Sequence, residues 1–505
     1  MAQFLNFLNN RVSFFILFIA FLNISMMGPE NVPVKDLLLS LDISGIFNIF
    51  LQAESFYRIP DTPIRFLIFI FSIVFFVLMI DKRIEIKKCP RIFITILPLI
   101  VYFFILTLLI TDGFYNYSAI LMVLLSFHYS LFYSKNNLSS LEKFFLLSYL
   151  AMFLVPFWSS MIHQTSFSEI DNYIRFILVI PIYLTLREIR IPMNNFINTV
   201  NLSSILIGLC ALYCLIILNE TRVRGFTSSA VIFGNISLVF FMFSFLSISR
   251  YINNNKNILF PLIASGATFF AWASTGSRGS VLLVLVFFFL LFTKPFKNLI
   301  IASKNVNIIF LLAITTIFVS SPIISRSIDS YGSTYNYITE GSEHHWRHSN
   351  SIVPRLNLWK GSIILINENT VKGIGLTNFN NSLNEQIKLK NIQPIRPLSD
   401  DLTDGQNHAH NQFLDIFIKT GVFGFLTLIF FMIIHLYYFY RRHHQSENNE
   451  DASLLSLFGI VSVVGYICYM FTNSVFSHQL STLFMTLLFI ILSGMITNKL
   501  GKNLT

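Results

Sequence analysis

Long apolar runs constrain this chain more than any other feature of its sequence. A helix of about 20 apolar residues crosses a hydrocarbon layer about 30 Å thick, and most of the runs are close to that length. Hydrophobic residues make up 54% of the 505 residues and charged residues only 12%, whereas soluble domains are about 25% charged. We therefore expect an all-α polytopic membrane protein. The runs fall at 12–27, 64–80, 91–110, 118–133, 143–162, 172–186, 201–218, 228–249, 257–274, 280–293, 306–323, 412–440, 453–474 and 478–496.

Basic residues gather in alternate connections between these runs. Under the positive-inside rule such clusters lie in the cytoplasm, and all of them face one side if both termini are cytoplasmic. The sequence therefore predicts about 12–14 transmembrane helices with both termini cytoplasmic. Run 12–27 lacks an Ala-x-Ala cleavage signal, so we interpret it as a retained anchor helix. The clusters contain Lys82, Arg83, Lys87, Lys88 and Arg91; Arg187 and Arg190; Arg250 and Lys256; Lys294, Lys297 and Lys304; and Arg441 and Arg442.

One hydrophilic segment is much longer than the other connections. Between residues 325 and 411 eight basic residues are balanced by eight acidic ones, so the formal net charge of +10 lies in the short connections. This distribution argues against a nucleic-acid site. We predict three parts: transmembrane helices 1–11 in residues 1–323, a large periplasmic loop with short helices in residues 324–411, and C-terminal transmembrane helices in residues 412–505.

Four arginines break the positive-inside trend. Arg175, Arg222, Arg224 and Arg278 lie at run ends on the same outer side as the loop. Ionisable groups at membrane depth are expensive and mark functional sites, so these four form a candidate anion site. For Arg175 the alternative is an ion pair with Asp171, one helical turn away. For Arg224 it is a solvated loop or a contact with lipid phosphate.

The stretch His408-Ala409-His410-Asn411 brings polar side chains to the start of run 412–440. His410 would lie near the positive end of a helix dipole, which favours a neutral imidazole. A neutral imidazole can act as a general base. The alternative is an interfacial histidine that caps the helix or contacts lipid headgroups.

Two further patterns follow within run 412–440. Asp415 and Lys419 are four residues apart and can pair along one helix face. Gly421 and Gly424 are three residues apart, a spacing that lets another helix approach closely.

These motifs resemble those of the bacterial O-antigen ligase superfamily, which includes O-antigen ligases, O-antigen polymerases and protein O-oligosaccharyltransferases. The resemblance covers about residues 171–424, and the superfamily is usually drawn with about twelve helices. It rests on His410-Asn411 followed after nine residues by Gly421-x-x-Gly424, Arg222-x-x-Gly225 followed by Phe233-Gly234-Asn235, Ser277-Arg278-Gly279, Arg355 with Trp359, and Gly373-x-Gly375.

The resemblance implies a glycosyltransferase of the inner membrane whose active site faces the periplasm. It would move O-antigen polysaccharide from undecaprenyl diphosphate to a lipid A–core sugar, inverting the anomeric carbon without a metal ion or cofactor. His410 would take the acceptor proton, and Arg222 and Arg278 would bind the diphosphate, because arginine pairs bidentately with phosphate. Second choices for the diphosphate are Arg224 and Arg175, and the supporting residues are Asn411, His408, Gly421, Gly424 and Arg355.

Other functions stay open. A polymerase would use a second lipid-linked glycan as acceptor, and a protein O-oligosaccharyltransferase would use a protein. A polytopic transporter or lipid flippase, which belongs to a different class, would catalyse no transfer.

Two groups in the loop have the residue types of metal sites. Asp400, Asp401 and Asp404 could hold Mg²⁺ against a diphosphate, although we prefer a solvated acidic loop. The second group is His344, His345 and His348. We likewise interpret these histidines as part of a polar loop, since no cysteine accompanies them.

Overall fold

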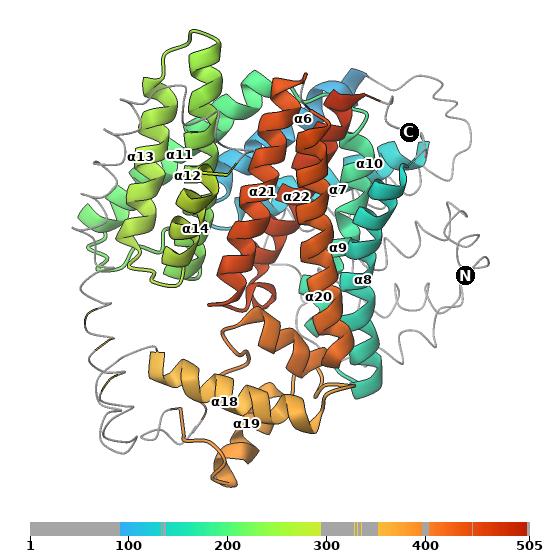
Figure 1. Cartoon of the computed structure of the whole chain (residues 1–505), viewed down its shortest axis with the longest axis vertical. Helices are drawn as coiled ribbons and strands as arrows, with labels where there is room; N and C mark the ends of the chain where they lie inside the picture. The colour runs from blue at the N-terminus through green and yellow to red at the C-terminus, as the bar shows by residue number, and fades with distance from the viewer. Residues whose placement is uncertain are drawn as a thin grey trace, which may run out of the picture.

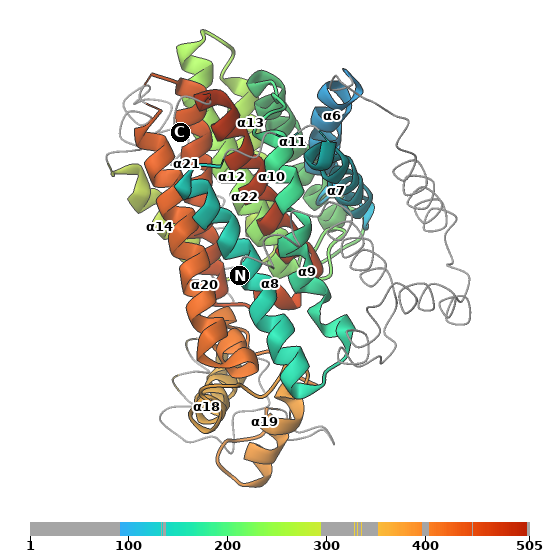
Figure 2. The same cartoon turned by 90° about the vertical axis from the view of Figure 1, so that its right-hand side faces the viewer.

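The computed structural model describes residues 91–132, 134, 138–293, 328, 331, 335, 352–395, 403, 405–446 and 448–501. These residues form helices joined by short connections, with no β-strand among them. Two short helices, α18 (Ile352–Glu368) and α19 (Phe379–Lys388), lie at one end of the bundle, here called the loop end (Figures 1 and 2). The other helices are α6 (Arg91–Thr107), α7 (Phe114–Phe132), α8 (Ser140–His163), η1 (Phe167–Ile170), α9 (Asp171–Leu178), α10 (Ile180–Leu186), α11 (Met193–Ile216), α12 (Ala230–Asn253), α13 (Leu259–Ser274), α14 (Val281–Leu291), α20 (Gln412–His444), α21 (Glu450–Met470), η2 (Val475–Ser477) and α22 (Gln479–Leu500).

The apolar runs correspond to these helices. The runs at 12–27, 64–80 and 306–323, and with them the expected anchor helix, lie outside the described residues, and the other eleven all form helix. Among the described residues, six helices are long and apolar enough to span a membrane, namely α8, α11, α12, α20, α21 and α22. The expectation of an all-helical, multi-pass membrane protein is thus confirmed. The total of 12–14 spanning helices and the sides of the loop and termini stay predictions.

Run 172–186 differs from the expected single helix. It forms two short helices, α9 and α10, which meet at Val179. Pro181 lies in the first turn of α10, and because proline has no backbone N–H it cannot continue the hydrogen bonds of α9.

Helices α12, α21 and α22 form the centre of the bundle. Their spanning segments are 83–94% buried, whereas those of α8, α11 and α20 are 50% buried and surround them. Helix α20 packs against α8 and α21, and its first half also contacts α18. Residues of α18, α19 and the connection before α20 form a second, smaller hydrophobic core that includes Ala409 and Ile418.

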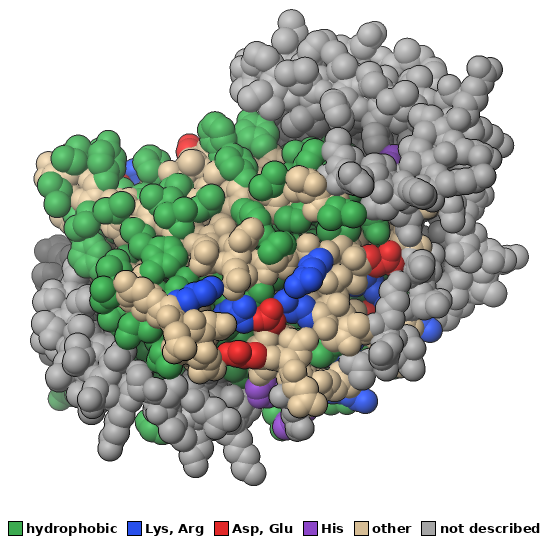
Figure 3. Space-filling model, turned by 90° about the horizontal axis from the view of Figure 1, so that it is seen from above, with side chains coloured by type: hydrophobic (Ala, Val, Ile, Leu, Met, Phe, Trp, Pro, Cys, Tyr) green, Lys and Arg blue, Asp and Glu red, His purple; other side chains and the backbone are tan. Residues whose placement is uncertain are grey.

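Basic residues gather at the opposite end of the bundle, here called the basic end. Helices α12, α20 and α22 finish at this end and α21 begins there. Arg250 and Lys499 both pair with Asp451, the latter at 2.7 Å. Seen from this end, Lys and Arg side chains lie beside acidic ones on the surface (Figure 3). The clusters at 187–190, 250–256 and 441–442 therefore share one end, as the charge pattern predicted.

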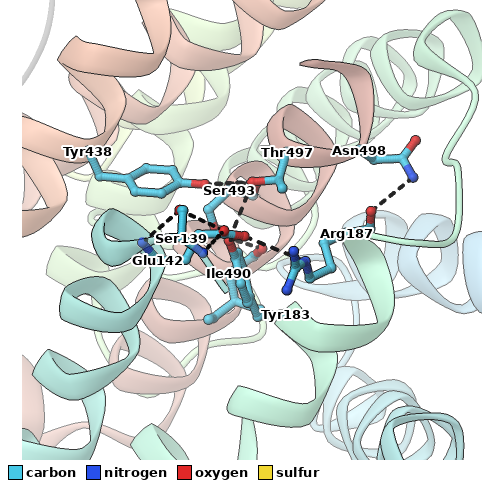
Figure 4. A network of polar contacts seen from close by, with 9 residues as sticks. All are labelled: Ser139, Glu142, Tyr183, Arg187, Tyr438, Ile490, Ser493, Thr497 and Asn498. Atoms are coloured by element: carbon cyan, nitrogen blue, oxygen red, sulfur yellow. Dashed lines mark hydrogen bonds and ion pairs between the residues drawn. The ribbon is translucent and has the colours of Figure 1, made fainter. Parts of the chain in front are cut away.

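A buried polar network connects four helices just inside the basic end (Figure 4). The hydroxyl of Tyr183 on α10 donates to Oε1 of Glu142 on α8 at 2.6 Å. Nε of Arg187 lies 3.5 Å from the same oxygen. The hydroxyls of Tyr183 and Tyr438 lie 3.3 and 2.8 Å from Oγ1 of Thr497 on α22. Because the Glu142 carboxylate is 2% exposed, its charge depends on these partners.

Replacing Glu142 by alanine should therefore destabilise the fold. The substitution removes the carboxylate that Tyr183 and Arg187 share, and breaking a buried ion pair costs about 3–5 kcal/mol. We expect a clearly lower melting temperature in detergent. Glu169→Ala, an exposed acid in η1, should leave it unchanged. Equal melting temperatures for the two variants would contradict a stabilising role of the network.

Candidate active site

The geometry of the loop end depends on a break in α20 at Gly421. Gly421 has φ 71° and ψ −167°, so the helix does not continue through it. Its neighbours bond to the connection after α18 instead: the backbone N–H of Val422 donates to Thr370 at 2.8 Å, and Ile374 donates to Ile418 at 2.8 Å. These bonds attach the connection between α18 and α19 to α20.

At Gly421 the close approach is made by a loop backbone rather than by another helix, so the prediction was wrong at this position. A Cβ on Gly421 would overlap the backbone carbonyl of Val371, so Gly421 admits a loop backbone. A Cβ on Gly424 would overlap Thr420 of its own helix. Glycine is required at 421 because L-residues with side chains rarely adopt its positive φ.

The turn that carries the histidines is attached to the first half of α20 by Asp415. One carboxylate oxygen of Asp415 accepts from the backbone N–H of Ala409 at 3.0 Å. The other accepts from Nζ of Lys419 at 3.0 Å, which confirms the predicted pair. Asn411 caps the helix, since its Oδ1 accepts from the backbone N–H groups of Phe413 and Leu414 at 3.0 and 3.1 Å.

His410 itself has an unusual backbone conformation. Its φ is 50°, in the left-handed region that residues other than glycine rarely adopt. The rings of His408 and His410 meet edge to face, with centroids 4.4 Å apart. The ring of His478, which precedes α22, also lies near His408, with centroids 5.6 Å apart. Sequence reasoning did not select His478, although it is a polar residue at the start of run 478–496, much as His410 lies just before run 412–440.

The segment between α21 and α22, here called the 471–478 connection, contacts the histidine turn at several points. Nδ2 of Asn411 donates to the carbonyl of Phe471 at 3.2 Å. The backbone N–H of Phe476 donates to Oε1 of Gln412 at 2.8 Å. Asn473 also lies near enough to His410 to act on the pKa of its imidazole. The sequence analysis assigned no role to this connection.

The segments that carry Arg222 and Arg278 pack together. Nε of Arg222 donates to the carbonyl of Thr275 at 2.9 Å. A Cβ on Gly234 would lie 2.9 Å from Oγ1 of Thr275, so the Phe-Gly-Asn element packs closely against the same turn. A Cβ on Gly279 would lie 2.6 Å from Oγ1 of Thr472. The turn with Arg278 therefore touches the 471–478 connection, which also touches His410.

Arg355 on α18 approaches the histidines from the loop side. Its charge acts on both His408 and His410. The indole N–H of Trp359, one turn further along α18, donates to the carbonyl of Ala409 at 3.1 Å. The Arg355 and Trp359 motif thus lies against the histidine turn.

The two second-choice arginines have carboxylate partners. Nη2 of Arg175 lies 2.7 Å from Oδ2 of Asp171, as the alternative interpretation predicted. Arg224, whose side chain is 64% exposed, lies 3.4 Å from Glu220. Arg175 is nevertheless at the loop end, because Nδ2 of the nearby Asn172 donates to the carbonyl of Phe476 at 2.8 Å.

Burial and neighbouring charges keep the imidazoles of His408, His410 and His478 neutral at pH 7. Burial above all, with contributions from the cationic forms of His408 and Arg355, lowers the pKa of His410 to about 3. Burial and His408 lower the pKa of His478 to about 4. Burial also lowers the pKa of His408, although Asp415 opposes it. The expected neutral imidazole at His410 is confirmed, with burial rather than a helix dipole as its main cause.

Within the described ranges no group of three His, Cys, Asp or Glu side chains could hold a metal ion. The two loop groups considered above lie outside those ranges: Asp400, Asp401 and Asp404, and His344, His345 and His348.

Comparison with known proteins agrees with the motifs. Residues 263–429 match the family model described as "O-Antigen ligase". The resemblance to the O-antigen ligase superfamily is confirmed. The matched O-antigen ligase domain contains Arg278, Arg355 and His410, while Arg175, Arg222 and Arg224 precede it. It supports a membrane enzyme of the O-antigen ligase and polymerase type.

The chain is also similar to a protein of Haemophilus influenzae (strain ATCC 51907 / DSM 11121 / KW20 / Rd) described as "Uncharacterized protein". The two are 26% identical over 394 residues, which cover 76% of this chain and 94% of the relative. The similarity therefore extends well beyond the O-antigen ligase domain.

Gly421→Ala should disrupt the loop end of the O-antigen ligase domain. The added Cβ would overlap the carbonyl of Val371, and φ 71° is strained for alanine. We expect a lower melting temperature and loss of the folded protein's activity. Gly266→Ala is the matched control, because nothing lies within 4 Å of its Cβ and alanine favours a helix. A Gly421→Ala protein as stable as Gly266→Ala would contradict the described break.

The stability of the fold should also decrease as the pH is lowered, because of the buried histidines. In the unfolded chain imidazoles titrate near 6.5, whereas the folded pKa values of His410 and His478 are about 3 and about 4. The unfolded state therefore binds more protons below pH 6.5, and stability present above that pH is lost as pH falls towards 4. We expect the melting temperature to drop between pH 7 and 5, and to drop less in a His410→Gln, His478→Gln double variant. His444→Gln, an exposed site at the basic end, should keep the wild-type slope; the same slope in the double variant would refute the assignment.

Proposed function

We propose that the protein is an O-antigen ligase. It would move polysaccharide from undecaprenyl diphosphate to a lipid A–core sugar at the periplasmic face of the inner membrane. The observation that carries this proposal is that the 471–478 connection touches both the turn with Arg278 and the turn with His410. A cationic group and a neutral imidazole at one end of a membrane protein suit transfer from a lipid diphosphate.

The arginines would bind the diphosphate of the donor. A leaving diphosphate gains negative charge as its bond to the sugar breaks, and preorganised guanidinium groups stabilise that charge. Arg222 and Arg278 are our first choices, because their segments are joined through Thr275. Arg355 adds positive charge from the loop side. Second choices are Arg175 and Arg224, which lie beside Asp171 and Glu220.

His410 would act as the general base. The acceptor hydroxyl oxygen attacks the anomeric carbon, the bond from that carbon to the diphosphate oxygen breaks, and the hydroxyl proton moves to the imidazole. This single displacement inverts the anomeric configuration and needs no metal step. A bound diphosphate would offset the charge of Arg355 and so raise the pKa of His410 towards neutrality, where a base is most effective.

The proposal is tested with purified protein, a lipid-linked glycan and a lipid A–core acceptor. We expect product without added metal, with EDTA present, and a loss of about 10²–10⁴-fold in rate for His410→Ala and Arg278→Ala. His444→Ala and Arg190→Ala, two exposed basic-end residues, are the controls and should keep wild-type rates.

The same assay separates the other functions. Product only when a second lipid-linked glycan replaces the lipid A–core acceptor would overturn the ligase assignment in favour of a polymerase. Full transfer by both His410→Ala and Arg278→Ala would refute the mechanism. Movement of the lipid across the bilayer without any transfer would indicate a flippase.

A further inference from the structure

Thr275 is a buried residue where the two arginine segments meet, and the proposed mechanism gives its side chain no role. It follows the last residue of α13 and is 0% exposed. Its carbonyl accepts from Nε of Arg222, and Arg278 lies three residues further along the chain. A side chain that fixes the backbone here would therefore fix both candidate diphosphate-binding groups.

The hydroxyl of Thr275 makes two hydrogen bonds within its own turn. Oγ1 donates to the carbonyl of Trp272 at 2.7 Å and accepts from the backbone N–H of Ser277 at 3.1 Å. The first bond attaches the side chain to the last turn of α13. The second attaches the residue that immediately precedes Arg278. One hydroxyl thus determines how the chain leaves the helix and enters the Ser-Arg-Gly element.

The other side of Ser277 is held by a second pair of side chains. The indole N–H of Trp272 donates to Oγ of Ser280 at 2.8 Å, and this Oγ donates to the carbonyl of Ser277 at 3.3 Å. Trp272 and Ser280 are both buried. The backbone of Ser277 is therefore bonded at its N–H and at its carbonyl, so Arg278 extends from a fixed point.

The segment with Arg222 is attached to the same end of α13. The backbone N–H of Val223 donates to the carbonyl of Ser274 at 3.2 Å, and Nε of Arg222 donates to the next carbonyl, that of Thr275, at 2.9 Å. From α12, Gly234 packs against the hydroxyl, since a Cβ there would lie 2.9 Å from Oγ1. The glycine of the Phe-Gly-Asn element thus leaves space for the Thr275 hydroxyl.

We propose that Thr275 is the positioning residue of the two arginines: its carbonyl holds the guanidinium of Arg222, its hydroxyl holds the backbone before Arg278, and both charges are thereby directed at one diphosphate. Because Thr275 is fully buried, it touches neither donor nor acceptor and acts only through the arginines. Preorganised cations need no rearrangement as charge develops on the leaving group. This inference rests on the proposed function, since it assumes that the arginines bind the diphosphate.

Thr275→Val tests the inference, because valine has a similar shape and lacks only the hydroxyl. Binding of undecaprenyl diphosphate to the purified protein and kcat of transfer should each fall about 10- to 100-fold through misplacement of the arginines, with the KM of the acceptor unchanged. Thr275→Ser keeps the hydroxyl and should restore both. Thr268→Val is the matched control, since this buried threonine of α13 donates to the carbonyl of Ala264 at 3.0 Å, away from the arginines.

Combined substitutions show whether Thr275 acts through the arginines. Thr275→Val should weaken binding of undecaprenyl diphosphate less in an Arg222→Ala or Arg278→Ala protein than in wild type, because part of what it positions is already missing. A merely structural residue would lower the melting temperature and affect binding equally in every background. Equal effects in all three backgrounds, or a failure of Thr275→Ser to restore binding, overturns the inference.

Ser280→Ala provides a test that leaves Thr275 intact. The change removes the hydroxyl between Trp272 and Ser277, and it should weaken binding of undecaprenyl diphosphate by a smaller factor than Thr275→Val does. If Thr275→Val does not fold, unchanged binding in Ser280→Ala overturns the inference.

The outcomes distinguish this inference from the proposed function. If wild-type protein binds undecaprenyl diphosphate but makes no product, the function is wrong, while the effect of Thr275→Val on binding still decides the role of Thr275. If wild-type protein is active, Arg278→Ala is inactive, and Thr275→Val behaves like Thr268→Val, the function stands and the role of Thr275 is refuted. If wild-type protein neither binds nor transfers, both are wrong.

Discussion

The loop end depends on how the backbone hydrogen bonds around Gly421 are completed. At membrane depth each N–H and C=O needs a partner within the protein, and the break in α20 leaves several without their helical ones. The connection after α18 supplies them: Thr370 accepts from Val422, while Ile374 and Gly375 donate to Ile418 and Lys419. The positive φ of one glycine thus determines where the loop attaches to the bundle.

Charge at this end of the protein is unevenly distributed. In the part of the chain that the structure describes, the one buried acid close to the histidines is Asp415. Its carboxylate is already engaged by Lys419 and by the backbone N–H of Ala409. Arg355 lowers the pKa of both His408 and His410, so its charge helps to keep these two imidazoles neutral. At the basic end, by contrast, one carboxylate pairs with two cations, since Arg250 and Lys499 share Asp451.

The sequence predicted what depends on composition and local spacing. Apolar runs indicated the helices, and polar residues at a membrane boundary indicated His410. The partner of Gly421 was predicted wrongly, because a Gly-x-x-Gly spacing does not say whether a helix or a loop approaches. Asn473 and His478 were not selected, because the chain brings them to the histidine turn from more than sixty positions away and no local spacing indicates that contact. The match to the O-antigen ligase family model supports the functional assignment of residues 263–429, while the roles of single residues stay proposals.

The left-handed backbone of His410 has a further consequence. A residue with a side chain at φ 50° bears a strain of about 1 kcal/mol or more, which the Asn411 cap and the Asp415 bond to Ala409 offset. Glycine or asparagine would adopt this turn more easily, yet neither carries an imidazole. Conformational preference and chemistry thus make opposite demands at one position. Folding alone would therefore not select histidine at this position.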